Sequence, residues 1–212
     1  MRRPVRRRRP AARRGAGAAA VLALIGGAGA AAVASAQEPA PDQSSVIVRD
    51  PAGDVRSKLD LTRLTLGRAA DGRLVSVLTL ATPWADGDLL ADAGPPGSLC
   101  LRLWTVSVPP DQPPDYLVCV TADKDGALRG SVLRERANAL PQKVAAAAVS
   151  RRSERTITVR FSQTSIGRPA ALQVAAEASR PNCLRVTCID GAPDAPSVRR
   201  MELRKPADGS GS

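Results

Sequence analysis

The stretch 59-LDLTRLTLGRAADGRLVSVLTLAT-82 decides the fold, because it contains the clearest β-hairpin signal in the chain. At its centre, Asp71-Gly72 suits the positive φ angles that a tight hairpin turn requires. On either side, at 59–67 and 73–82, apolar and polar side chains largely alternate, as in strands with one buried face. The alternation slips within the first arm, and a β-bulge near Thr62-Arg63 would absorb that slip.

Outside this hairpin, turns rich in proline, glycine and aspartate divide the chain into further short segments. Strands are predicted at 46–48, 99–104, 116–120, 128–134, 144–149, 157–161, 172–177 and 201–203. The Ala-rich segment 144–149 has helix propensity, but its length and its place among strands favour a strand. Residues 84–92 could hold one helical turn.

The rhythm of about nine short strands indicates an all-β domain, either a two-sheet sandwich or a barrel. We expect a two-sheet antiparallel β-sandwich of the jelly-roll or immunoglobulin-like kind. The domain is predicted at 46–205, between a flexible lead-in at 37–45 and a disordered tail at 206–212.

The first 36 residues have the order of a secretory signal peptide. Eight arginines between Arg2 and Arg14 precede an Ala/Gly/Val/Leu run, which ends in the small residues Ala34-Ser35-Ala36. The alternative is an uncleaved anchor, since the apolar run of about 19 residues is near the minimum for a span. The weak hydrophobicity of Ala and Gly favours cleavage before Gln37, which leaves a secreted domain with no stable membrane span. The Arg13-Arg14 pair is a weak indication of twin-arginine export.

The basic charge of the whole chain is concentrated in this signal. The chain has 31 basic and 20 acidic residues, and eight of the bases but none of the acids precede Gln37, so the remainder has net charge +3. Its bases are dispersed and are not interleaved with its few aromatic side chains as stacking platforms. We therefore expect no nucleic-acid partner.

The four cysteines predict a disulfide framework, because oxidation is the default in an exported chain. Cys100 and Cys119 lie on consecutive predicted strands and can face each other. Cys183 and Cys188 are close enough in sequence to close a small loop. The spacings do not match the paired ligands of a zinc site.

The sequence contains no histidine, which excludes Ser-His-Asp and Cys-His catalysis and imidazole metal sites. A glycoside hydrolase that uses two carboxylates remains an alternative. Only Glu177, among the few glutamates, lies inside a clear strand, where a solvated outer face is the ordinary interpretation. We expect no enzyme.

Two acidic clusters stand near opposite ends of the domain: Asp50, Asp54 and Asp60 in the first, and Asp190 and Asp194 in the second. If the terminal strands are neighbours, these clusters could converge and hold calcium, which binds carboxylates from flexible loops. The alternative is that aspartate simply suits turns, since its side chain caps local N–H groups. The only cofactor we consider is therefore calcium.

Trp84 and Trp104 are the candidate ligand-binding residues. An exposed pair of indoles would form a platform on which sugar rings stack. A tryptophan at an alternating strand position is otherwise a half-buried core residue. Exposure of both side chains on one face would distinguish the two interpretations.

The run Val48-Arg49-Asp50-Pro51-Ala52-Gly53-Asp54, followed by Leu59-Asp60-Leu61, resembles the opening of secreted bacterial β-sandwich domains of the DOMON-like and family-9 carbohydrate-binding-like kind. That resemblance implies a sugar-binding or haem-binding domain, often with calcium, and the lack of histidine argues against haem. We therefore expect an exported, non-catalytic binding or structural module, with a polysaccharide or another cell-envelope component as partner. The alternative is a protein-interaction domain without a small ligand.

Overall fold

The computed structural model describes residues 45–105, 111–183 and 188–203. The predicted signal peptide, nearly all of the lead-in at 37–45 and the tail at 206–212 lie outside these residues. Within the described part, no helix combines the length and the hydropathy that crossing a membrane requires.

The described residues are almost entirely strands and turns, which confirms the all-β class. Eleven strands occur in this part, and all of them except β10 overlap a segment predicted as a strand. They are β1 (Val46–Arg49), β2 (Leu61–Arg68), β3 (Leu74–Leu80), β4 (Ser98–Trp104), β5 (Tyr116–Ala122), β6 (Leu128–Arg134), β7 (Gln142–Ser153), β8 (Thr156–Phe161), β9 (Ala171–Ser179), β10 (Ile189–Ala192) and β11 (Arg199–Glu202). Two single 3₁₀ turns, η1 (Asp86–Leu89) and η2 (Gln163–Ile166), interrupt them, and η1 is the helical turn predicted within 84–92.

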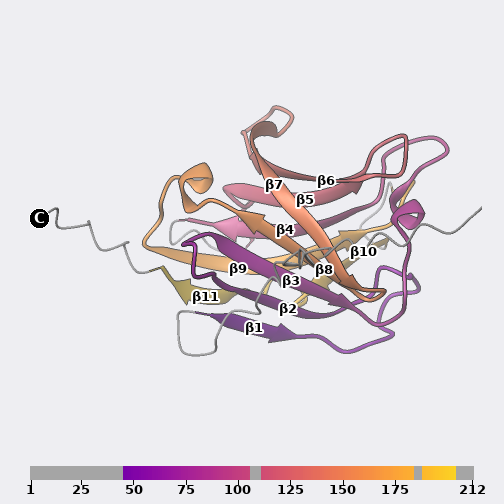
Figure 1. The fold of residues 1–212 in the computed structure, drawn as a ribbon, viewed down its shortest axis with the longest axis horizontal. Coiled ribbons are helices and arrows are strands. Elements are labelled where there is room, and N and C mark those ends of the chain that lie inside the picture. Colours follow the sequence, from indigo (N-terminus) through magenta and orange to yellow (C-terminus); the bar gives the residue numbers. More distant parts are fainter. Residues whose placement is uncertain (1–44, 106–110, 184–187, 204–212) are drawn as a thin grey trace, which may run out of the picture. The chain divides into compact units, whose positions relative to one another are not determined.

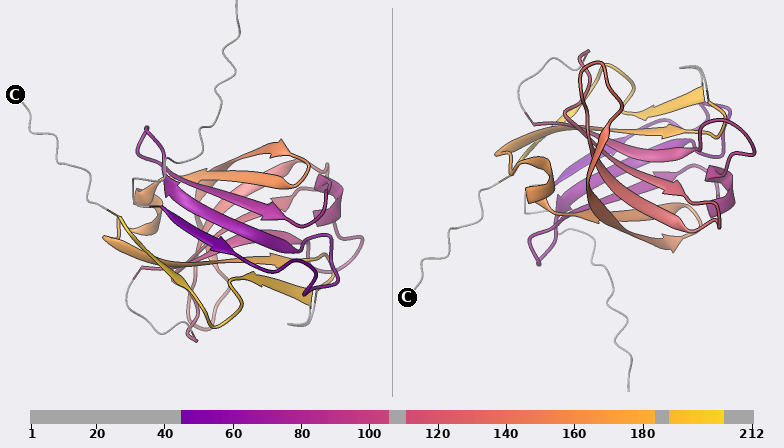
Figure 2. Two further views of the ribbon diagram at one scale, coloured as in Figure 1. Left: turned by 90° about the horizontal axis from the view of Figure 1, so that it is seen from below. Right: turned by 90° about the horizontal axis from the view of Figure 1, so that it is seen from above.

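The strands form one antiparallel sheet that is nearly closed into a barrel (Figures 1 and 2). Hydrogen-bonded neighbours follow the order β1-β2-β3-β8-β7-β6-β5-β4-β9-β10, and β11 pairs with β9. The sheet is continuous because β7 pairs with β6 through its first half and with β8 through its second half. The expected two-sheet sandwich is therefore not confirmed.

The hairpin that the sequence predicts is formed by β2 and β3. Gly72 has φ +77°, the left-handed conformation that its turn requires. The register of the pair shifts between Leu61 and Arg63, which confirms the predicted bulge. The bulge lets Leu61, which precedes it, face the same core as Leu64 and Leu66, which follow it.

The core occupies the inner face of the sheet. Leu99, Leu101 and Leu103 of β4 are fully buried there, and the side chains that alternate with them belong to the outer face. The inner-face cluster also contains leucines from β2 and β3 and valines from β5 and β9. Burial of these branched side chains is the main favourable contribution to folding.

Both predicted disulfides are present. Cys100 on β4 stands directly opposite Cys119 on β5, and the two are bonded. Cys183 is bonded to Cys188 just before β10. Two structural disulfides point to an oxidising compartment outside the cytoplasm.

One strand was not predicted. The segment that contains Asp190 was interpreted as an acidic turn, but Ile189–Ala192 forms β10 and pairs with β9. Its four residues include a glycine and a buried aspartate, so neither length nor composition signals a strand. The predicted Ala-rich strand and the last predicted strand are confirmed as β7 and β11.

Candidate metal centre and adjoining pocket

The candidate site lies where the two ends of the sheet approach each other. There β10 is not paired with β2, but a side chain connects them: Asp190 Oδ2 accepts a hydrogen bond of 2.5 Å from the backbone N–H of Leu61. Asp190 pairs in register with Ala178, whose side chain is in the core, and is itself 4% exposed. A buried carboxylate therefore occupies the seam of the nearly closed sheet.

A tight turn carries two further carboxylates to this seam. The N–H of Asp50 donates to the carbonyl of Thr62 at 3.0 Å, which fixes the start of the turn. Gly53 has φ +89°, and its N–H donates to Asp60 Oδ2 at 2.7 Å. Only glycine adopts that conformation without strain, so the Asp-x-x-Gly-Asp sequence places Asp50 and Asp54 around Asp60.

All five aspartates of the two predicted clusters converge here. They make two groups in which one carboxylate oxygen of each residue lies within 4.8 Å of the others: Asp50, Asp54 and Asp194, and Asp54, Asp60 and Asp190. Asp54 belongs to both groups. The condition under which the two clusters could converge is thus met, although the meeting elements are the 50–60 segment, β10 and the loop after β10.

The electrostatics of the cluster are unfavourable without a cation. Burial, reinforced by Asp194, Asp54 and Asp190, raises the pKa of Asp50 to about 7 from the ordinary 3.8. Burial, together with Asp54 and Asp60, raises the pKa of Asp190 to about 6, although hydrogen bonding from Leu61 opposes this rise. Hard carboxylate oxygens in this arrangement are ligands of the kind that calcium takes.

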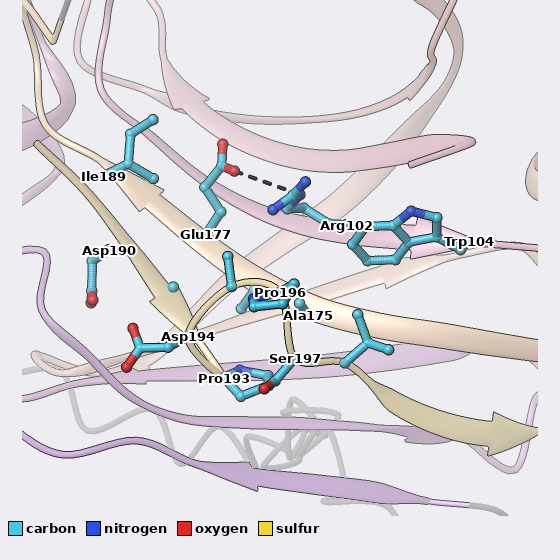
Figure 3. A pocket seen from close by; sticks show the side chains of 14 residues that line it. Arg102, Trp104, Ala175, Glu177, Ile189, Asp190, Pro193, Asp194, Pro196 and Ser197 are labelled. Carbon is cyan, nitrogen blue, oxygen red and sulfur yellow. Dashed lines mark ion pairs between the residues drawn. The ribbon is translucent and has the colours of Figure 1, made fainter. Parts of the chain in front are cut away.

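A pocket of about 480 Å³ adjoins the cluster on the outer face of β4 and β9 (Figure 3). Asp190 and Asp194 line one side of it, and Arg102 and Trp104 line the other. The loop between β10 and β11, at 193–198, forms part of its wall. Sequence reasoning did not find this pocket, because it depends on the pairing of β9 with both β4 and β10.

Two of the residues that line this pocket form an ion pair. Arg102 Nε and Glu177 Oε2 are 3.7 Å apart, on adjacent strands in a diagonal arrangement (Figure 3). The Glu177 side chain is only 27% exposed, so it does not lie on a freely solvated face as the sequence suggested. Burial raises its pKa, although Arg102 opposes this effect.

Of the two interpretations of Trp84 and Trp104, the structure favours the buried one, and no platform of two exposed indoles is formed. Trp84 is 4% exposed and Trp104 is 1% exposed. The guanidinium of Arg102 lies 5.1 Å from the ring centroid of Trp104, and that of Arg151 lies 4.2 Å from the ring centroid of Trp84. The two indoles line separate depressions, so they do not act as one stacking surface.

Comparisons of the chain with protein-family models, with curated proteins and with solved structures found no match. The resemblance to DOMON-like and carbohydrate-binding domains therefore stays a prediction from the sequence motif.

Proposed function

We propose that this chain is an exported, non-catalytic binding module and that its ligand occupies the pocket between β4, β9 and the 193–198 loop. The observation that carries the proposal is the pocket itself, which combines an apolar wall with a few convergent polar groups. Its volume of about 480 Å³ falls in the usual range for small-ligand sites. The secretory pattern of residues 1–36 and the two disulfides support export.

The ligand we propose is a carbohydrate of the cell envelope, bound by its end or by a short segment. Arg102 can donate hydrogen bonds to sugar oxygens, and Glu177 and Asp194 can accept them from hydroxyls. Pro193 and Pro196 offer apolar surface to the C–H face of a ring. Because Trp104 is covered, recognition would depend on this pocket and not on stacking along a flat platform.

The test is binding of the purified domain to cell-wall and polysaccharide fractions. Arg102→Gln and Glu177→Gln each remove one charge of the ion pair in the pocket, and each is expected to weaken binding at least tenfold. Arg129→Gln, on β6 and outside the pocket, is the control and is expected to bind normally. If the wild-type domain binds no fraction, or if all three variants bind alike, the proposal is wrong.

A second candidate is a protein-interaction domain without a small ligand. The burial of both tryptophans favours it, since neither indole is available to a sugar. Protease treatment of the envelope fraction would abolish binding in this case, whereas carbohydrate digestion would not. Release of reducing sugar by the domain would instead favour the glycoside hydrolase alternative.

A further inference from the structure

We infer that the acidic cluster binds two calcium ions, which share Asp54 and connect the ends of the sheet. The inner ion is held by Asp54, Asp60 and Asp190, and the outer ion by Asp50, Asp54 and Asp194. This inference goes beyond the proposed function and does not depend on what fills the pocket.

The inner site is marked by a buried carboxylate with one oxygen that lacks a hydrogen-bond partner in the described part of the chain. Asp60 is 4% exposed, and its Oδ2 accepts a hydrogen bond from Gly53. Its other oxygen, Oδ1, is buried and has no hydrogen-bond partner within the described residues. A buried charge without a partner is costly, and a cation among Asp54, Asp60 and Asp190 would remove that cost.

The outer site is more open than the inner site, since the Asp50 side chain is only partly buried. Asp50 Oδ2 is buried and has no hydrogen-bond partner in the described part of the chain. Asp54 and Asp194 are exposed, so water can complete the coordination of an ion there. The outer ion would join the 50–54 turn to the loop that forms the pocket wall.

Geometry and charge both favour two ions. Oxygens that bind one calcium ion at about 2.3–2.6 Å are at most about 5 Å apart, and each group of three meets that limit separately. Only Asp54 is common to both groups. None of the ion pairs found among the described residues includes any of the five aspartates, so one divalent ion would leave most of their charge uncompensated.

The ligand set favours calcium over other metals. The chain has no histidine, and all four cysteines are in disulfides. Carboxylate oxygens without nitrogen or thiolate ligands suit calcium, magnesium or manganese. The seven-coordinate flexibility of calcium fits ligands from a turn, a strand and a loop better than the strict octahedron of magnesium does.

The test is the calcium stoichiometry of the folded domain, measured by native mass spectrometry and by calorimetric titration with calcium chloride. Wild type is expected to bind two ions. Asp60→Asn and Asp194→Asn are each expected to bind one, and Asp54→Asn is expected to lose both sites or to bind at least a hundredfold more weakly. Asp125→Asn, in the exposed β5–β6 turn, is the matched control and should bind two.

Circular dichroism of every variant verifies that it is folded, and exposed Asp194 can be changed without disturbing the core. One ion in the wild type would overturn the shared arrangement, and none would overturn the site altogether. Loss of both ions in Asp194→Asn would also contradict it, because the inner group does not contain Asp194. None of these outcomes bears on whether carbohydrate binds in the pocket.

Discussion

Replacing Asp190 with asparagine should change stability in opposite directions with and without calcium. The amide oxygen of asparagine can still accept the hydrogen bond from Leu61, so the backbone connection across the seam is kept. The substitution removes one of five negative charges. Without calcium this relieves repulsion, and with calcium it removes a ligand.

The magnitudes follow from the surroundings of Asp190. Its pKa rises from 3.8 to about 6, and one pKa unit corresponds to about 1.4 kcal/mol. Burial is the largest cause and solvent screens the remaining repulsion, so we expect Asp190→Asn to stabilise the calcium-free domain by about 1 kcal/mol. For a domain of this size that is a rise of roughly 2–4 °C in Tm.

With calcium at about a hundred times its Kd, each bound ion stabilises the folded wild type by about 2.7 kcal/mol. The loss of the inner ion, about 2.7 kcal/mol, is offset by the ~1 kcal/mol gained from the relieved repulsion, so Asp190→Asn should then melt roughly 3–7 °C below wild type. The assay is thermal unfolding of both proteins in excess chelator and in saturating calcium, with Asp125→Asn as control. A shift of the same sign in both solutions would refute the reasoning.

Three further outcomes are expected. Replacing both Cys100 and Cys119 with alanine should lower the free energy of unfolding by about 3 kcal/mol, because the disulfide closes a loop between residues 19 positions apart. Denaturant titration measures this loss, and a loss below about 1 kcal/mol would count against a structural role. Gly53→Ala should lower Tm and weaken calcium binding in the calorimetric titration, since φ +89° strains any residue with a Cβ. An unaltered calcium affinity would show that the conformation of this turn does not matter for the metal site. In calcium-free buffer, Asp50 and Asp190 have folded pKa values of about 7 and about 6, above their ordinary 3.8, so their protonated forms stabilise the fold fully below pH 3.8 and this contribution is lost as pH rises through 6 to 7. Tm should therefore fall over that pH range more steeply than in Asp50→Asn, and equal slopes would contradict the crowding of the carboxylates.

Local features of the sequence predicted much of the fold. The Asp71-Gly72 turn, the bulge at Thr62 and the alternation of β4 depend on neighbours within a few residues, and each is present. The two disulfides could also be predicted, because Cys100 and Cys119 lie on consecutive strands and Cys183 and Cys188 are close in the sequence. The nearly closed sheet was not, since it depends on β7 pairing with different partners along its length.

The convergence of the five aspartates could be predicted from the sequence, whereas their surroundings could not. The Asp-x-x-Gly-Asp turn is a local motif, and its meeting with Asp190 needed only the assumption that the ends of the domain are close. The pairing of Arg102 with Glu177 could not be predicted from the sequence, because β4 and β9 are far apart in the chain and only their pairing in the sheet brings these residues together. The sequence left open whether the tryptophans are exposed, and the structure decides for burial of both, with an arginine guanidinium near each ring.

The most direct test of the central claim, that the seam of the sheet is closed by cations held among five aspartates, is a crystal structure of the domain grown with calcium. The anomalous difference map is expected to contain two peaks on either side of Asp54. One should lie among the carboxylates of Asp54, Asp60 and Asp190, and the other among those of Asp50, Asp54 and Asp194. A map without a peak at this cluster in saturating calcium, or with the five carboxylates turned away from one another, would contradict the account.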